Sequence, residues 1–261
     1  MTPMEKLKSI KIFTKSTLSN HIFIIGFCIL ISSLFMLVAT KSSPLYPLNN
    51  WADANISFTM GKGMMNGKVI YRDLFDHKGP LFYLLFGLAY IISNTTFFGV
   101  FIFEVMFFSF FLLFSYKIIT LYVDNEYAII SLPLLGAAVL NLNSFADGGS
   151  AEEFCLPLIM ISLYHLLRYF KEYYPEPFPN RWLVINGVIA GCVLWIKFSL
   201  LGFWFGWMAS VFTLHFLKKD FLRSLKASLV FLSGMLLVTL PWVIYFGIHQ
   251  SIYEWINSYF V

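Results

Sequence analysis

The chain has 261 residues, of which 59% are hydrophobic and only 12% are charged. A soluble domain carries about 25% charged residues, so this composition excludes a soluble globular protein and indicates a polytopic helical membrane protein. The net charge of +4 does not point to nucleic acid, because in a membrane protein the position of each charge matters more than the sum. Cys28, Cys155 and Cys192 all fall within apolar runs, which favours neither a disulfide framework nor a metal site.

Eight apolar runs are candidates for crossing the hydrocarbon layer, which takes about 20 residues of α-helix. The first run has no small-residue cleavage site behind it, so it is interpreted as a retained anchor. The stretch 182–216 corresponds to about 52 Å of helix, too long for one crossing, and a turn is expected at Lys197–Ser199. The runs are 21–40, 79–94, 97–121, 128–146, 153–168, 182–198, 199–217 and 227–247.

Lysine and arginine indicate the direction of these runs, because they favour the cytoplasmic side of short loops. The N-terminus and two later loops are basic, whereas loop 147–152 carries only acidic charges. All four segments reach their favoured sides only if run 79–94 does not cross. We therefore predict seven crossings, a cytoplasmic N-terminus, and an interfacial or re-entrant helix at 79–94 on the outer face. The basic residues are Lys6, Lys8, Lys11 and Lys15, then Arg168, Lys171 and Arg181, then Lys218, Lys219, Arg223 and Lys226.

The predicted organisation is an all-α integral membrane protein with a cytoplasmic segment at 1–20 and a polytopic module at 21–247. Residues 41–96 form the first outer loop of that module and include its juxtamembrane helices. Residues 248–261 begin a further outer loop. Because the chain stops there in a polar and aromatic stretch, the sequence indicates a fragment or a truncated product.

Charged side chains gather in the first outer loop, at the mouth of the predicted interfacial helix. A lysine beside a helix N-terminus, as at Lys78 before Gly79 and Pro80, can hold an anionic phosphate. Carboxylates of this loop, together with Glu152 and Glu153 on the same side, would suit a general base or a divalent cation such as Mg²⁺ or Mn²⁺. For each residue alone, pairing with a neighbour in a solvated loop is the alternative. The residues of the loop are Asp53, Arg72, Asp73, Asp76, His77 and Lys78.

Two ionisable residues fall within apolar runs. Glu104 lies about two turns into run 97–121, and Lys197 lies at the outer end of run 182–198. Charges inside the membrane are costly and usually face a polar interior or each other. We expect Glu104 and Lys197 to pair or to line a polar cavity, with a purely structural ion pair as the alternative.

The segment WADANISFTMGKGMMNGKVIYRDLFDHKGPLFYLL resembles the first outer loop of bacterial GT-C glycosyltransferases, which are related to protein O-mannosyltransferases and aminoarabinose transferases. The resemblance implies a seven-crossing module, a role for Asp53 at the acceptor as base or metal ligand, and a role for Lys78 at the donor phosphate. In GGSAEEFCLP, Glu152 and Glu153 resemble the acidic residues of the second outer loop, although an Asp-x-Asp pair is missing. Lys197, in CVLWIKFSLLG, resembles a basic residue of the family.

The resemblance implies a glycosyltransferase of the plasma membrane that moves a sugar, with inversion, from a polyprenyl-phosphate donor to an extracytoplasmic hydroxyl. Its partners would be membrane lipid, the lipid-linked donor, and a cell-envelope glycan or protein as acceptor. The acceptor would be activated, directly or through the cation, by Asp53, Glu152 and Glu153. The departing phosphate would be neutralised by Lys78, Arg72 and Lys197. Supporting positions are Asp73, Asp76, His77 and Glu104.

Two hypotheses from other classes remain. One is a transporter or flippase for a lipid-linked saccharide, which predicts ionisable residues near the middle of the membrane and paired interrupted helices. The polar groups of this chain instead gather toward one face, which favours the transferase. The other is a non-catalytic truncated remnant, which the early end of the chain keeps open.

Overall fold

The structure is a computed structural model that describes residues 3–145, 147–217 and 219–261, with side chains from residue 21 onward. In this part of the chain all regular elements are helices, so the predicted all-α class is confirmed. Ala146 and Lys218, which were assigned to a crossing and to a basic loop, lie outside the described residues. So do the side chains of the N-terminal lysines.

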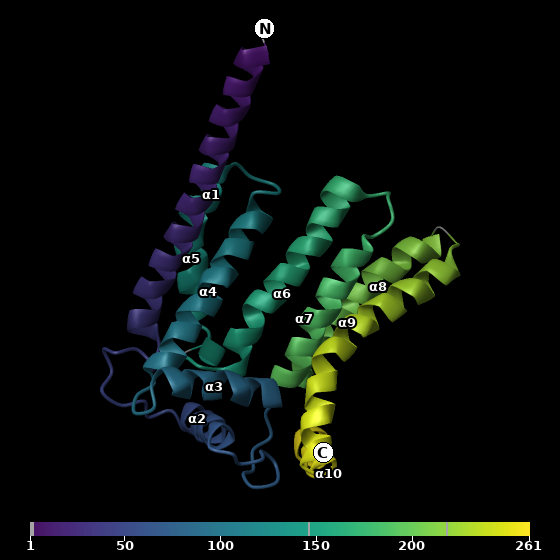
Figure 1. The fold of residues 1–261 in the computed structure, drawn as a ribbon. Helices are drawn as coiled ribbons and strands as arrows, with labels where there is room; N and C mark the ends of the chain where they lie inside the picture. Colours follow the sequence, from purple (N-terminus) through teal and green to yellow (C-terminus); the bar gives the residue numbers. More distant parts are fainter. Residues whose placement is uncertain (1–2, 146, 218) are drawn as a thin grey trace.

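Among the described residues, five helices are long and apolar enough to cross a membrane. Two shorter apolar helices, α5 (Asn125–Leu140) and α7 (Asn180–Ile196), run beside them in the bundle (Figure 1). Outward side chains such as Leu134 and Phe205 are 71% and 77% exposed, which suits contact with lipid. The five helices are α1 (Pro3–Ala39), apolar over His21–Ala39, α4 (Phe98–Ile119), α6 (Ala151–Arg168) with the turn after it, α8 (Gly202–Leu217) with the turn before it, and α9 (Phe221–Ile248).

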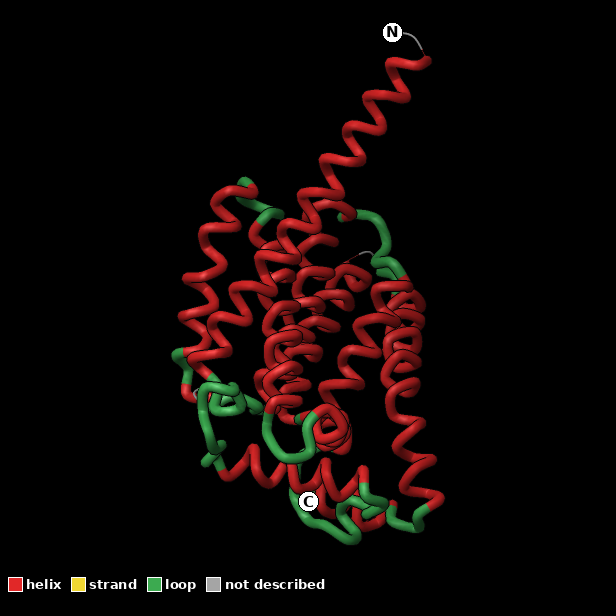
Figure 2. Tube along the Cα trace, turned by 60° about the vertical axis from the view of Figure 1, so that its left-hand side comes forward, coloured by secondary structure: helices red, strands yellow, loops and turns green. Residues whose placement is uncertain are grey.

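Two helices lie across the bundle instead of along it. Figure 1 shows α2 (Ala52–Met65) and α3 (Pro80–Ile92) at the bottom, where the C-terminus also lies, and we call this the lower end. The N-terminal part of α1 projects beyond the opposite, upper end, as Figure 2 also shows. Helix α3 corresponds to run 79–94, the run that the charges predicted not to cross.

Two helix boundaries differ from the predicted runs. The first apolar run begins at residue 21, but α1 begins at Pro3, because polar residues with good helix propensity can continue a helix beyond its apolar part. Helix α5 ends at Leu140 and is followed by a short 3-10 turn at Asn143–Phe145. Asn and Ser side chains compete for backbone hydrogen bonds, which ends the helix before the predicted residue 146.

The turn expected at Lys197–Ser199 is confirmed. Lys197 follows the last residue of α7 and has an extended backbone, with φ −155° and ψ 98°. A 3-10 turn at Phe198–Leu201 then leads into α8. The C-terminal helix α10 (Ile252–Phe260) holds this turn in place, because Tyr259 Oη accepts a hydrogen bond from Phe198 N at 3.0 Å.

The buried core has two parts, a larger one formed mainly by α3, α6, α7, α8 and α9 and a smaller one formed mainly by α1, α4 and α5. Aromatic rings anchor α3 to the larger part. Phe82 and Phe86 meet the ring of Phe154 in α6 edge-on, at centroid distances of 5.9 and 6.2 Å. Such pairs stabilise by about 0.5–1.5 kcal/mol beyond their buried area, so the N-terminus of α3 has a defined position at the lower end.

Candidate active site

The first lysine–carboxylate pair joins α2 to the N-terminus of α3. Lys78 Nζ lies 3.4 Å from Asp53 Oδ2, with the lysine side chain 15% exposed and the aspartate 54% exposed. The ammonium group also lies 5.7 Å from the centroid of the Phe82 ring. The Lys78 ammonium group is therefore held between the Asp53 carboxylate and the Phe82 ring, while the carboxylate is open to an incoming molecule.

Two tyrosine hydroxyls hold the backbone of Lys78. Tyr83 Oη accepts a hydrogen bond from Lys78 N and donates one to Asp76 Oδ2, each at 2.8 Å. Tyr71 Oη donates to Lys78 O at 2.5 Å. Burial raises the pKa of both tyrosines, so both hydroxyls stay protonated and keep their donor roles. The sequence analysis missed this clamp, although both tyrosines flank the charged motif.

Gly79 joins the first pair to the second. Its backbone N–H donates to Ile196 O at 3.1 Å, so the start of α3 touches the end of α7. A Cβ atom at this position would lie 2.0 Å from Trp195 O, a distance that real Cβ contacts do not show. Only glycine allows this approach, which joins the residue after Lys78 to the residue before Lys197.

The second pair joins α6 to the turn after α7. Lys197 Nζ forms an ion pair and hydrogen bond with Glu152 Oε1, and the two side chains are 38% and 31% exposed. Glu152 belongs to the first turn of α6, where Ser150 Oγ caps the helix by accepting from Glu153 N at 3.1 Å. A carboxylate in the first turn is stabilised by the helix dipole.

Glu153 and Glu104 lie away from these pairs. Glu153 is 2% exposed and its Oε2 accepts from Gly149 N at 2.8 Å. Its direction differs from that of Glu152 because successive helix residues point about 100° apart. Glu104 is fully buried and accepts hydrogen bonds from Thr40 Oγ1 at 2.9 Å and from a neighbouring serine. Glu104 and Lys197 therefore do not pair with each other, which was one of the two arrangements expected for them, since each has another partner.

The charges at 72–77 form local contacts. Arg72 Nε lies 2.9 Å from Asp73 Oδ1, and Arg72 Nη1 donates to His249 O at 3.1 Å, which turns Arg72 toward the end of α9. Hydrogen bonds from Arg72 and from Val69 N lower the pKa of Asp73 to about 2. His77 Nδ1 lies 3.1 Å from Asp76 Oδ1. None of these contacts involves the two lysine–carboxylate pairs directly.

A third pair, which was not predicted, joins the loop after α1 to the loop before α6. Lys41 Nζ lies 2.5 Å from Asp147 Oδ1, and Lys41 N donates to Asp147 O at 3.0 Å. The signal in the sequence was a lone lysine shortly after the first apolar run and a lone aspartate shortly before run 153–168. Loops far apart along the chain thus meet at the lower end.

The proposed cation ligands do not converge. Asp53 contacts Lys78, Glu152 contacts Lys197, and Glu153 is turned into the bundle. Within the described part of the chain, no three His, Cys, Asp or Glu side chains form a group that could hold a metal ion. As placed, these three carboxyl groups do not fit one shared divalent cation.

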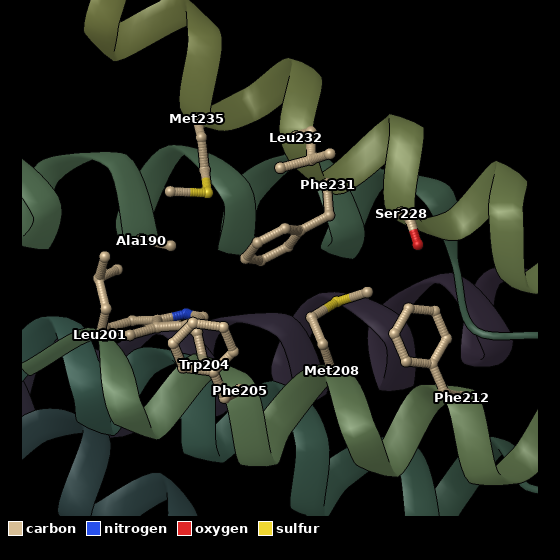
Figure 3. Close-up of a pocket in the computed structure, with 10 residues that line it drawn as sticks. All are labelled: Ala190, Leu201, Trp204, Phe205, Met208, Phe212, Ser228, Phe231, Leu232 and Met235. Atoms are coloured by element: carbon tan, nitrogen blue, oxygen red, sulfur yellow. The ribbon is translucent and has the colours of Figure 1, made fainter.

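An apolar cleft opens between α8 and α9, beginning at Leu201, four residues beyond Lys197. Its volume is about 350 Å³. Figure 3 shows that side chains from both helices point into it, while the small Ala190 of α7 closes its back. The other lining residues are Trp204, Phe205, Met208, Phe212, Ser228, Phe231, Leu232 and Met235.

A sequence model of a protein family, described as "Putative competence-induced protein Ccs4 N-terminal domain", matches residues 11–261. The chain belongs to this family. The match extends from within α1 to the end of α10, so the lower end, its three pairs and the cleft all lie in the shared domain. No curated protein and no solved structure matches the chain. The family description names no reaction.

Proposed function

We propose that this chain is a membrane-embedded glycosyltransferase that moves a sugar from a polyprenyl-phosphate donor to the hydroxyl of an extracytoplasmic acceptor. The supporting observation is the meeting of two lysine–carboxylate pairs, Asp53–Lys78 and Glu152–Lys197, at one end of a bundle of apolar helices. The hydrogen bond from Gly79 N to Ile196 O joins the backbone segments next to Lys78 and Lys197. Such a site offers two cations for a phosphate and two carboxylates for a proton.

The topology that accompanies this proposal has seven crossings, made by α1 and α4 to α9. Helix α3 lies across the lower end and does not count as a crossing (Figure 1). The upper end carries Arg168, Lys171 and Arg181, which favour the cytoplasm. The lower end is then extracytoplasmic, and the N-terminus is cytoplasmic.

The two lysines suit a departing phosphate. Negative charge grows on the phosphate oxygens as the bond to the sugar breaks, so a cation held in place beforehand stabilises the transition state more than the ground state. Lys78 meets this requirement because the Tyr71–Tyr83 clamp fixes its backbone and its side chain is only 15% exposed. Lys197, whose backbone is extended in the turn after α7, would be the second cation for the phosphate.

Asp53 is the base in this proposal. When the donor phosphate takes over Lys78, the Asp53 carboxylate loses its partner and can accept the proton of an acceptor hydroxyl. The acceptor oxygen then attacks the anomeric carbon, the bond from that carbon to the phosphate oxygen breaks, and polyprenyl phosphate leaves with the electron pair. Glu152 could serve a second hydroxyl in the same way when Lys197 engages the phosphate.

The apolar cleft between α8 and α9 suits the hydrocarbon tail of the donor. It starts next to the turn that carries Lys197, and its walls are apolar apart from Ser228 (Figure 3). A chain of isoprene units would enter it from the lipid while its phosphate stays at the lower end. The phosphate would then lie beside the lysines, and the hydrocarbon tail would lie against apolar side chains.

Transfer of labelled sugar tests the proposal. Purified protein would be incubated with radiolabelled polyprenyl-phosphate hexoses and pentoses and with a cell-envelope fraction as acceptor. We expect transfer by the unaltered chain and a loss of about 100-fold or more in Asp53→Asn, the range for removing a general base. Glu126→Gln, an exposed carboxylate of α5, is the control and should keep full activity. Full transfer by Asp53→Asn would refute the assignment of the base, and passage of labelled lipid across vesicles without transfer would favour a transporter.

A further inference from the structure

At the upper end, three cations lie against aromatic rings. Lys117 Nζ, in the last turn of α4, lies 4.5 Å from the centroid of the Phe114 ring and 5.8 Å from that of Tyr164. The guanidinium carbon of Arg168 lies 5.9 Å from the Tyr164 ring as well. Lys171 Nζ lies 5.3 Å from the centroid of a further tyrosine ring, Tyr122. One ring thus lies near two positive charges.

The positive charge of this cluster exceeds its negative charge. Arg168 Nε has a carboxylate partner, Glu172 Oε2, at 2.7 Å. Within the described residues, no carboxylate lies within ion-pair distance of Lys117 or Lys171, whose recorded partners are the rings. Ring faces attract cations but carry no net charge, so the cluster still lacks an anion.

The position of the cluster identifies the kind of anion. Lys117 ends an apolar helix, at the level where lipid headgroups meet water. Met106, Phe110 and Leu113 precede it on the same face of α4, at helical spacings of four and three residues. These three residues line an apolar cleft of about 420 Å³ between α1 and α4. An acyl chain in that cleft would place its headgroup beside the lysine.

We propose that Lys117, Arg168 and Lys171 form a binding site for the phosphate of an anionic phospholipid. Its acyl chain lies in the cleft between α1 and α4, and its phosphate bridges the cations of α4 and of the turn after α6. The site does not depend on the proposed transferase activity, because it lies at the opposite end of the bundle. It would couple α4 to α6 through a bound lipid.

The test compares three additives on the purified full chain in detergent. Phosphatidylglycerol should raise the thermal unfolding midpoint, because a ligand that binds only the folded state stabilises it. Phosphatidylcholine and inorganic phosphate should not, since the first has no net charge and the second has no acyl chain. Native mass spectrometry would count the retained phosphatidylglycerol directly.

Matched variants identify the residues. Lys117→Gln and Lys171→Gln should each weaken phosphatidylglycerol binding about fivefold. The double variant Lys117→Arg/Lys171→Arg keeps both charges and should retain binding. Lys62→Gln is the control, because Lys62 also lies over a tyrosine ring, 5.9 Å from the centroid of Tyr90, but belongs to α2 at the lower end. Unchanged binding by Lys117→Gln/Lys171→Gln would overturn the proposal. An equal midpoint shift with phosphatidylcholine or with inorganic phosphate would overturn it as well.

Discussion

The two ends of the bundle differ in the groups that several of their lysines contact. At the lower end three lysines are paired with carboxylates, in Asp53–Lys78, Glu152–Lys197 and Lys41–Asp147. At the upper end Lys117 and Lys171 lie on aromatic rings instead. The lower pairs are close to neutral before any ligand arrives, whereas the upper cluster keeps a positive charge.

This difference suits the two ends of the bundle to different roles. An anion that binds at the lower end must displace a carboxylate from its lysine, and the displaced carboxylate becomes available to accept a proton. An anion that binds Lys117 and Lys171 at the upper end displaces no carboxylate from these two lysines, because a ring remains where it is when the cation gains a partner. The lower end therefore suits a reaction that releases phosphate, and the upper end suits stable binding of a lipid.

Gly79→Ala should have the largest effect, because it separates the Asp53–Lys78 pair from the Glu152–Lys197 pair. The added Cβ would meet Trp195 O at 2.0 Å, so the start of α3 must move away from α7. We expect a loss of about 1–3 kcal/mol in stability, the usual cost of overpacking, together with loss of sugar transfer. Thermal unfolding in detergent and the transfer assay would measure the two effects.

Gly206→Ala is the matched control for that substitution. A Cβ at Gly206 in α8 would meet no atom within 4 Å, so transfer should be unchanged, and stability should not fall, because alanine favours a helix by up to about 1 kcal/mol over glycine. Binding of phosphatidylglycerol at the upper end should also survive in Gly79→Ala. A Gly79→Ala protein with normal stability and activity would show that the junction of α3 and α7 is not required.

A double-mutant cycle on Glu152 and Lys197 should give the next largest effect. The pair is partly buried, so we expect a coupling free energy of about 1 kcal/mol or more from unfolding of Glu152→Gln, Lys197→Gln and the double variant. The same cycle on Arg168 and Glu172, whose side chains are 35% and 41% exposed, should give about 0.3–0.5 kcal/mol, the range for ion pairs four residues apart on a helix. Equal couplings would show that the Glu152–Lys197 pair is no stronger than an ion pair within one helical turn.

Much of the fold follows from the sequence, because a helix that crosses the hydrocarbon layer must be apolar and long enough to span it. Apolar runs predicted the bundle, and charge placement singled out run 79–94, which the structure shows as α3 lying across the lower end. The turn at Lys197 followed from length alone, since one helix over 182–216 would be too long. Each of these inferences needs only the hydrophobicity and charge of a segment.

The directions of individual side chains did not follow. Glu152 and Glu153 are adjacent in sequence, yet one pairs with Lys197 and the other is buried at Gly149, because the phase of α6 depends on its packing. The partners of Glu104 are hydroxyls from the loop after α1, including Thr40, which no spacing relates to it. Contacts of this kind depend on how helices meet, and a single sequence carries no direct signal of that.

The smallest predicted effect is a loss of stability at acid pH, when Asp73 in its exposed contact with Arg72 becomes protonated. The pKa of Asp73 is about 2 in the folded chain and 3.8 as a free side chain, so its contribution to stability is complete above pH 3.8. That contribution is lost as the pH falls from 3.8 toward 2. Solvent screens the contact, so only a slight fall of the unfolding midpoint is expected over this interval. Asp73→Asn should remove this part of the pH dependence, and Asp124→Asn, at the upper end, should not. Identical pH profiles for Asp73→Asn and the unaltered chain would show that Arg72 is held to the end of α9 without help from Asp73.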